Sequence, residues 1–427
     1  MKLNWLPYLL FILLPTQLGK YFFLPAAYIS GLRSDYLAIS FYLTDIISAL
    51  IILGYFLRVN RHPELVSGSV LIKMLKRVQH DKHLSFSPFL FFSLSLFLYL
   101  FLSSLFISVN PIISLFKLLK LLEIGLLCFV LIRLRPDISK IILSISIGAF
   151  YSSVLAILQF IKGGSLNGLW WFLGERTFTV TTPGIAAFSL NGMRFLRPYA
   201  AFPHPNVLAG FLAISSLSII WYLRYKKPLS KKVFYYFAGV LVFGLIALIL
   251  TASRNAIFAY AIGILLLLKP VKFDGKSVIA FFTCVLISIF IPLFISIPNE
   301  SILERKALIK KSFDIIQSSG VLGVGLNGFI QIPNNTMHFM GVGAYQPVHN
   351  VFLLILAETG MVGVFLFLVI VHLIFCDYKL SFVSFSPVLF SLFLLSLFDH
   401  YLFTLQEGML ITVSVISLAF LARKKYT

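Results

Sequence analysis

Acidic residues, and charged residues in general, are scarce in this sequence of 427 residues. Only 12% of the residues are charged, and 15 Asp and Glu stand against 35 Lys and Arg, which leaves a formal net charge of +20. A soluble domain of this length needs far more polar surface to cover its core, so the composition excludes a soluble fold. The three cysteines have no disulfide-framework or metal-site spacing, and we expect them to be packing residues in or beside apolar segments.

Long apolar runs are what the sequence has in abundance. Hydrophobic residues make up 59% of the chain, and the mean hydropathy is +0.97. Runs of about 17 to 25 apolar residues recur from end to end, and each can cross ~30 Å of hydrocarbon. We therefore expect an all-α polytopic membrane protein, a single integral membrane domain over residues 1–427 with about twelve transmembrane helices. The expected spans lie near 4–18, 38–58, 86–107, 112–134, 139–161, 206–223, 233–252, 255–268, 277–297, 350–375, 381–398 and 407–422.

Basic residues alternate between the two sides of these spans. The side that carries both termini holds most of them, in clusters such as Arg58/Arg61 and Arg423/Lys424. Short basic loops stay in the cytoplasm, so both termini are expected to be cytoplasmic. This pattern accounts for the positive charge, and no nucleic acid partner is expected. No small-residue cleavage site follows the first apolar run, which we interpret as a retained helix.

Two long loops then lie on the outer side, at 162–205 and 298–349. The second contains an amphipathic stretch, Ser301 to Gln317, in which apolar residues at helical spacing alternate with Lys and Arg. We expect a short helix there, lying along the outer membrane surface. The cytoplasmic loop 61–83 carries no recognisable chemistry.

The first polar motif at a span end is Arg197-Pro-Tyr-Ala-Ala-Phe-Pro-His204-Pro-Asn206. Pro205 fixes the backbone at the start of a helix, and Asn206 can accept from the free amides of its first turn. Helix N-termini attract anions, and Arg suits two-point contact with phosphate. Arg197, His204 and Asn206 are therefore candidates for an anion site, although Arg197 beside lipid headgroups and His204 in a plain turn would also fit.

The second motif is Ser253-Arg254, where one span ends and the next begins with almost no loop between them. An arginine on the side poor in positive charge runs against the topology bias. Arg254 is therefore a candidate for binding an anion, with Ser253 beside it. Anchoring of Arg254 by lipid phosphate is the alternative.

The third motif, Val348-His349-Asn350, opens a span directly after the second outer loop, with Glu358 behind it. The unperturbed pKa of histidine, ~6.5, lets His349 accept a proton from a hydroxyl at neutral pH. Glu358 is expected to hold a neighbouring helix rather than to pair with His349. Asn350 and Glu358 are both retained as substrate-binding candidates. The Gly323-Val-Gly325 stretch lacks the other residues of a phosphate loop, so we expect a tight turn there.

Two further constellations are weaker. Lys117, Lys120 and Glu123 form a polar stripe in one span, which fits an internal ion pair or the wall of a water-filled cavity. Asp399 and His400 end another span on the outer face. Of these residues we retain Lys120 as a substrate-binding candidate.

Taken in order, these motifs resemble the O-antigen ligase and O-antigen polymerase family of bacterial membrane glycosyltransferases. The matching elements are Arg197 with the Pro-His-Pro-Asn helix start, Thr251-Ala-Ser253-Arg254, Gly323-Val-Gly325-Leu-Asn327, and His349-Asn350 leading to Glu358-Thr-Gly360. The similarity is dense from about 190 to 370 and diffuse elsewhere.

The resemblance implies transfer of a glycan from an undecaprenyl-diphosphate-linked donor to an acceptor hydroxyl, at the outer face of the bacterial inner membrane. On that basis Arg197 and Arg254 hold the diphosphate, and His349 deprotonates the acceptor, with inversion at the anomeric carbon. The resemblance implies no metal and no cofactor. It leaves open whether the acceptor is a lipid-linked core sugar, as in a ligase, another repeat unit, as in a polymerase, or a protein.

The main alternative is a secondary transporter with twelve helices. A transporter predicts two related halves and broken helices that meet near the middle of the membrane. The sequence shows no related halves, and its polar candidates lie at one boundary of the bilayer.

Overall fold

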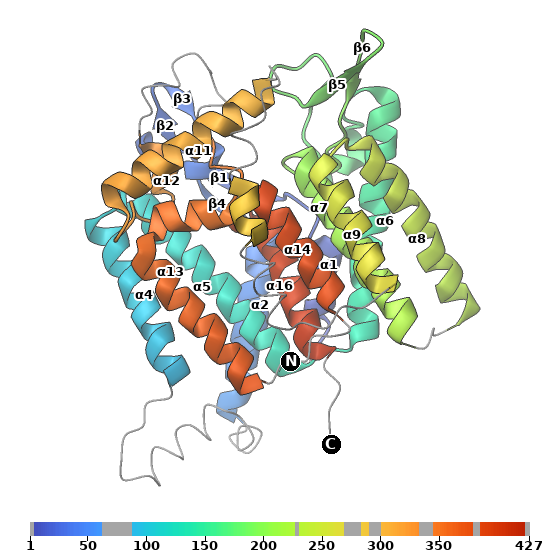
Figure 1. The fold of residues 1–427 in the computed structure, drawn as a ribbon. Coiled ribbons are helices and arrows are strands. Elements are labelled where there is room, and N and C mark those ends of the chain that lie inside the picture. The colour runs from blue at the N-terminus through green and yellow to red at the C-terminus, as the bar shows by residue number, and fades with distance from the viewer. Residues whose placement is uncertain are drawn as a thin grey trace.

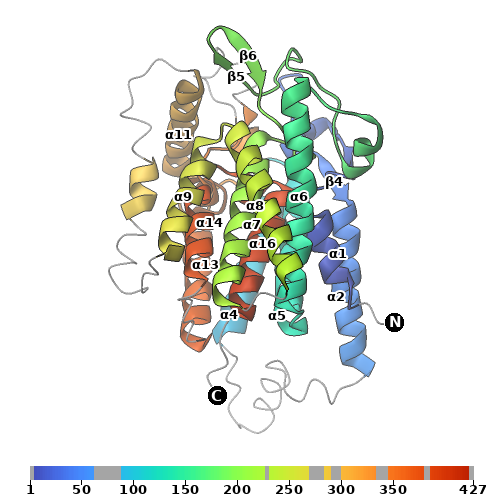
Figure 2. The same cartoon turned by 90° about the vertical axis from the view of Figure 1, so that its right-hand side faces the viewer.

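The computed structural model describes residues 4–61, 88–226, 230–268, 283–289, 300–332, 345–378 and 385–422. Helices that run roughly side by side form a bundle, and a cap of short strands and helices covers one end of it (Figures 1 and 2). The bundle helices are α1 Leu6–Leu13, α2 Leu43–Arg61, α4 Pro88–Phe106, α5 Pro111–Leu134, α6 Ile138–Lys162, α7 Pro205–Tyr225, α8 Lys231–Leu250, α9 Arg254–Leu268, α13 Val351–Tyr378, α14 Ser386–Phe398 and α16 Gln406–Leu421.

Five of these helices are long and apolar enough to cross a membrane: α4, α6, α7, α8 and α13, the last assessed over Val351–Leu373. The helices α9, α14 and α16 are apolar but shorter. These findings confirm a helical membrane protein. The expected number of twelve spans stays a prediction, because the span at 277–297 is described only over 283–289, which is helical.

The sequence places the helix ends by ordinary capping. Asn110 accepts a hydrogen bond from the amide of Ile113 at the start of α5, and Asp137 does the same for Lys140 in α6. Gly163 ends α6 in the left-handed conformation that a glycine adopts without strain. These signals account for the good agreement between the expected spans and α4 to α9.

Two expected spans near the N-terminus were wrong in extent. The span at 4–18 ends already at Leu13, where Pro15 follows, and the span at 38–58 begins with a strand. That strand, β4 Ile39–Tyr42, pairs antiparallel with β1 Gly19–Phe22. Hydropathy could not separate these apolar strand residues from the adjoining helix, because a half-buried strand and a span are both rich in apolar side chains.

The cap combines the N-terminal strands with both long loops. The N-terminal part contributes η1 Pro25–Ala27, the hairpin of β2 Tyr28–Ile29 and β3 Leu32–Arg33, and η2 Asp35–Leu37. The first long loop contributes η4 Gly168–Leu173 and the hairpin of β5 Ala187–Leu190 and β6 Met193–Leu196. The second long loop contributes α11 Glu300–Ser319 and α12 Gly328–Gln331. Helix α11 confirms the expected amphipathic helix. The sequence analysis did not foresee the strands. The start of α1 and the end of α16 lie toward the opposite end of the bundle (Figure 1).

Helix α13 changes direction at Gly360, whose φ of 62° and ψ of −175° are not helical. The part before Gly360 runs across the bundle, and the part after it runs along the bundle beside α4 (Figure 1). At the kink, Val324 N donates to Ala357 O over 3.2 Å and Gly325 N donates to Glu358 O over 2.9 Å. Gly323 N also donates to Ser319 O over 2.7 Å and Gly328 N to Gly325 O over 3.0 Å, so the expected turn at Gly323–Gly325 is present and packs directly on the kink.

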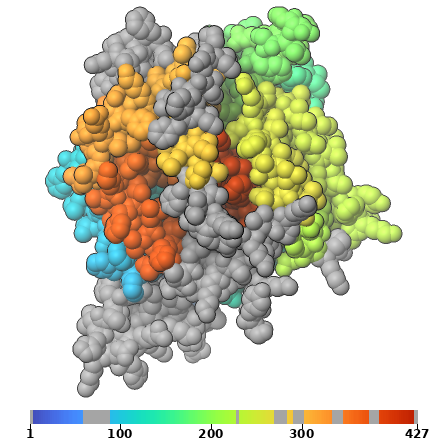
Figure 3. Space-filling model, in the orientation of Figure 1, coloured from blue at the N-terminus to red at the C-terminus, as the bar shows by residue number. Residues whose placement is uncertain are grey.

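Burial shows which helices are central. In α7, 83% of the most apolar window is buried, whereas in α4 only 11% is, so α7 lies inside the bundle and α4 on its lipid-facing side. Helices α14 and α16 are also largely buried. In the space-filling view, C-terminal residues show only as a narrow strip between α13 and α9 (Figure 3). The outer ends of α7 and α14 are thus enclosed by the cap and by their neighbours.

Candidate active site

Asp399 is the centre of a polar cluster under the cap. It follows α14 in an extended conformation and is 5% exposed. Its Oδ1 accepts from the amide of His400 over 2.8 Å, and its Oδ2 accepts from Asn206 Nδ2 over 2.9 Å. His349 Nδ1 lies 3.5 Å from Oδ1. Asp399 therefore joins the starts of α7 and α13 to the end of α14.

A chain of hydrogen bonds extends the cluster to Arg197. Its guanidinium donates through Nη2 to Asn206 Oδ1 and through Nε to Thr251 O, each over 2.6 Å. Thr251 ends α8, directly before Ser253 and Arg254. Arg197 thus ties the start of α7 to the turn that carries Arg254, and its orientation is fixed at two points.

Arg254 begins α9 and its side chain is exposed. In the described part of the chain it makes no side-chain hydrogen bond or ion pair, and it is close enough to Arg197 to lower the pKa of that guanidinium, although burial lowers it more. Ser253 is buried, and its amide contacts Thr251 Oγ1 over 3.3 Å. Of Arg197 and Arg254, Arg254 is therefore the one whose guanidinium nitrogens are all available to a ligand.

His204 is the N-cap of α7, which corrects the expectation that Asn206 has this role. Its Nδ1 accepts from the amide of Asn206 over 3.1 Å, and Pro205 takes the first helical position. The Asn206 side chain is unable to cap because it bridges Arg197 and Asp399. Burial lowers the pKa of His204 to about 4, so the ring stays neutral and Nε2 carries its proton.

His349 and His400 lie side by side over Asp399, with ring centroids 5.2 Å apart. His400 Nδ1 contacts Thr404 Oγ1 over 2.8 Å, and burial lowers the pKa of His400 to about 3. Burial raises the pKa of the Asp399 carboxyl, but the neighbouring His349, His400 and Arg305 outweigh it and hold that pKa well below its usual range. The cluster is therefore an anion, Asp399, beside two imidazoles.

Arg305 on α11 and Tyr36 in the cap complete the surroundings. Arg305 Nη1 donates to Phe398 O over 3.2 Å, and the ring of Tyr36 lies 5.4 Å from that of His400. The sequence analysis noted Asp399 and His400 but gave neither a place in the site. It took Arg305 only as part of the basic face of the amphipathic stretch, and it missed Tyr36. An acidic residue in so basic a chain was the available signal for Asp399.

Asn350 and Glu358 hold the backbone around His349. Asn350 is buried; its Oδ1 accepts from Leu353 N over 2.9 Å and its Nδ2 donates to Leu397 O over 3.0 Å. Glu358 is buried, and its backbone carbonyl accepts from the amide of Gly325 over 2.9 Å. Asn350 thus fixes α13 to α14, and the Glu358 backbone fixes α13 to the turn before α12.

The polar stripe of α5 lies nearer the N-terminal strands. Lys120 forms a buried ion pair with Asp45 of α2 and lies 3.8 Å from Glu123. Lys120 and Lys117 also line a cavity of about 700 Å³ beneath the cap. Both readings of the stripe, an ion pair and a cavity wall, therefore hold for Lys120.

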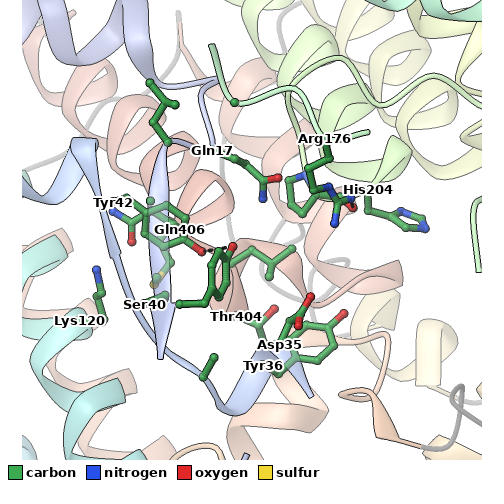
Figure 4. Close-up of a pocket in the computed structure, with 18 of the residues that line it drawn as sticks. Gln17, Asp35, Tyr36, Ser40, Tyr42, Lys120, Arg176, His204, Thr404 and Gln406 are labelled. Carbon is green, nitrogen blue, oxygen red and sulfur yellow. Dashed lines mark hydrogen bonds between the residues drawn. The ribbon is translucent and has the colours of Figure 1, made fainter. Parts of the chain in front are cut away.

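That cavity adjoins the Asp399 cluster. His204 and Thr404 belong to both, as does Tyr36 (Figure 4). Arg176 and His204 lie on one side of the cavity and Lys120 on the other (Figure 4). A ligand in the cavity would thus reach the edge of the cluster.

Among the described residues, the one group that could hold a metal ion is part of this cluster. His349, Asp399 and His400 offer ligand atoms within 4.8 Å of one another. Both oxygens of Asp399 already accept hydrogen bonds, and Thr404 contacts one nitrogen of His400. This arrangement suits an imidazole oriented by a carboxylate at least as well as it suits a cation.

Comparison with protein families gives one match for this chain, and comparison with curated proteins gives none. The matching family model is described as O-antigen ligase and covers residues 239–368. That range runs from within α8 to within α13 and includes Arg254, His349 and Glu358. It confirms the resemblance drawn from the sequence motifs over this range: residues 239–368 match the O-antigen ligase family.

Proposed function

We propose that this protein transfers a glycan from an undecaprenyl-diphosphate-linked donor to an acceptor hydroxyl at the outer face of the bacterial inner membrane. The observation that supports this most is the contact of His349 with the anionic Asp399, in a cluster joined through Asn206 to Arg197. It combines a base with cations in one place. The match of residues 239–368 to the O-antigen ligase family supports the lipid-linked substrate class.

His349 serves as the base in this proposal. With Nδ1 directed at Asp399, its Nε2 is left to accept a proton. The acceptor oxygen attacks the anomeric carbon from the face opposite the diphosphate, and the bond from that carbon to the phosphate oxygen breaks. The proton passes to His349 and the electron pair leaves with the diphosphate, so the configuration inverts.

The leaving diphosphate needs electrostatic support more than it needs an acid, because it already carries charge. Arg254 has its fork free, and Arg197 is held in a fixed orientation beside it. Fixed cations aimed at a developing charge are effective because they need no reorganisation during the reaction. We therefore place the diphosphate at Arg254 and Arg197, and we propose that the reaction needs no metal and no cofactor.

The test is a transfer assay with the purified, detergent-solubilised protein. A short glycan on undecaprenyl diphosphate and a lipid-linked acceptor sugar are supplied, and release of undecaprenyl diphosphate is measured with and without EDTA. We expect release in both cases. No release with any acceptor would reject the proposal, and release that EDTA abolishes would reject its metal-independent form. Comparing a core-sugar acceptor with a second repeat unit separates a ligase from a polymerase.

A further inference from the structure

The cavity beneath the cap has a volume of about 700 Å³ and adjoins the reacting cluster. Its walls come from five places: the N-terminal strands with their turns, α5, the first outer loop, Asn327 of the second outer loop, and the start of α16 with the residues before it. Such a volume is typical of sites for small molecules. Neither Arg197 nor Arg254 lines it, so it is separate from the proposed diphosphate site.

The lining suits a sugar. Tyrosine rings and an indole offer flat apolar faces, and amides and hydroxyls offer donors and acceptors. These side chains are Tyr21, Tyr36, Tyr42, Trp171, Gln17 and Gln406. Tyr36, Tyr42, Gln17 and Gln406 are labelled in Figure 4. Apolar walls with a few polar groups that fix orientation are the usual composition of ligand sites. Because His204 and Thr404 belong to both the cavity and the Asp399 cluster, a glycan here would end beside His349.

The acidic groups of the lining are already engaged. Glu175 accepts from Gln159 Nε2 over 2.8 Å and from the amides of Leu166 and Asn167, each over 2.7 Å. Asp35 lies 3.5 Å from Arg33, another lining residue. Both carboxylates therefore already have hydrogen-bond donors or a cation of the protein as partners.

Two cations of the lining have no carboxylate partner at ion-pair distance among the described residues. Arg176 donates to Pro203 O over 2.6 Å, and Lys117 donates to Phe403 O over 2.6 Å, but no carboxylate of the described residues lies at ion-pair distance from either. Lys120 by contrast is paired with Asp45. Glu407 interacts electrostatically with Arg176, but it is buried and does not line the cavity.

We propose that this cavity holds the acceptor glycan and selects one that carries a carboxylate or a phosphate, with Arg176 and Lys117 as the residues that determine this preference. The inference rests on the proposed glycosyl transfer. A neutral glycan would leave both cations without a carboxylate at ion-pair distance, whereas an acidic group gains charge-assisted hydrogen bonds. Arg176 is the better probe of the two, because it is exposed and its replacement leaves the packed core intact.

The test measures binding to the full-length, detergent-solubilised protein in the absence of donor. The probes are fluorescently labelled cellotetraose and its analogue with the terminal glucose oxidised to glucuronic acid. We expect the acidic probe to bind about tenfold more tightly, since one charged hydrogen bond is typically worth that much. Arg176→Gln should remove most of the difference. The matched control is Arg194→Gln, on the exposed hairpin outside the cavity, which should keep it.

Equal binding of the two probes by the wild type would overturn the inference, as would an unchanged preference in Arg176→Gln. Since these measurements need no donor, they are read independently of the transfer assay. Absence of transfer would remove the proposed function, not the binding preference.

Discussion

Asp399 is the residue on which the arrangement of the site depends. It is buried and anionic, and it contacts His349, Asn206 and the amide of His400. Without its charge nothing favours the tautomer of His349 in which Nδ1 carries the proton and Nε2 is free. The role of Asp399 is to position His349, and it need not touch the substrate.

We therefore expect Asp399→Asn to reduce glycan transfer by about a hundredfold or more, while donor binding stays near that of the wild type. The amide has the size of the carboxyl group but no charge. Transfer and donor binding are measured on the same purified variant. Asp137→Asn at the other end of the bundle is the control, since Asp137 only caps α6. Parallel loss of both readouts would make Asp399 a structural residue only.

His204 gives a pH dependence of stability. In the folded protein burial holds its pKa at about 4 against the ordinary 6.5, partly opposed by Asp399 and reinforced by Arg197, His349 and Arg176. Between these values the unfolded chain binds a proton and the folded protein does not. Stability from this group is therefore complete above about pH 6.5 and falls as the pH decreases toward 4.

The variant His204→Asn keeps a side chain that caps helices well but removes the titrating group. We expect the thermal unfolding midpoint of the wild type in detergent to fall more between pH 7.5 and pH 5 than that of His204→Asn. Equal falls in the two proteins would mean that His204 already titrates in the folded state near its ordinary pKa.

At the scale of elements, the kink in α13 is what brings His349 to Asp399 while the rest of the helix follows the bundle. Gly360 and Gly323 approach each other with positive φ angles, and a Cβ on Gly360 would lie 2.5 Å from Gly323 N and from Val321 O. Only glycine fits at position 360, because a Cβ there would collide with both of these backbone atoms.

We expect Gly360→Ala to destabilise the protein by about 1–3 kcal/mol and to lower transfer as His349 shifts. The thermal unfolding midpoint in detergent and the transfer rate are the measurements. Gly239→Ala in α8 is the control, since an added Cβ there meets no atom within 4 Å and the backbone is ordinary helix. An unchanged thermal unfolding midpoint in Gly360→Ala would show that the contact between position 360 and the backbone of Val321 and Gly323 can relax.

Elements with a local signal could be predicted from the sequence. The apolar runs gave α4 to α9, and the alternation of Lys and Leu gave α11, because these patterns repeat within one element. The strands β1 and β4 could not be separated from spans, since their pairing is not local. The site shows the same limit: Asn206 and Asp399 are 193 residues apart, and no spacing in the sequence indicates that they meet.

At the scale of the whole molecule, the fold places the polar cluster and the cavity at one end of the bundle, under the cap. The start of α1 and the end of α16 lie toward the opposite end (Figures 1 and 2). The distribution of basic residues predicts that the end with the termini is cytoplasmic. The site would then face the outer leaflet.

This orientation can be tested with single cysteines introduced into a variant without Cys128, Cys284 and Cys376. Ser189→Cys on β5 should react with a membrane-impermeant maleimide in intact spheroplasts, because the cap is expected outside. Ser230→Cys, between α7 and α8, should react only after permeabilisation. Both positions are exposed in the structure. The reverse pattern would place the site in the cytoplasm and contradict an outer-leaflet reaction.

The central role of His349 is tested most directly by measuring donor binding and undecaprenyl diphosphate release on the same preparations of wild type and His349→Ala. We predict that the wild type binds the lipid-linked glycan and releases undecaprenyl diphosphate when an acceptor is present. His349→Ala should bind the donor as well as the wild type does and release none. Release by His349→Ala at a rate near that of the wild type would contradict the assignment of His349 as the base.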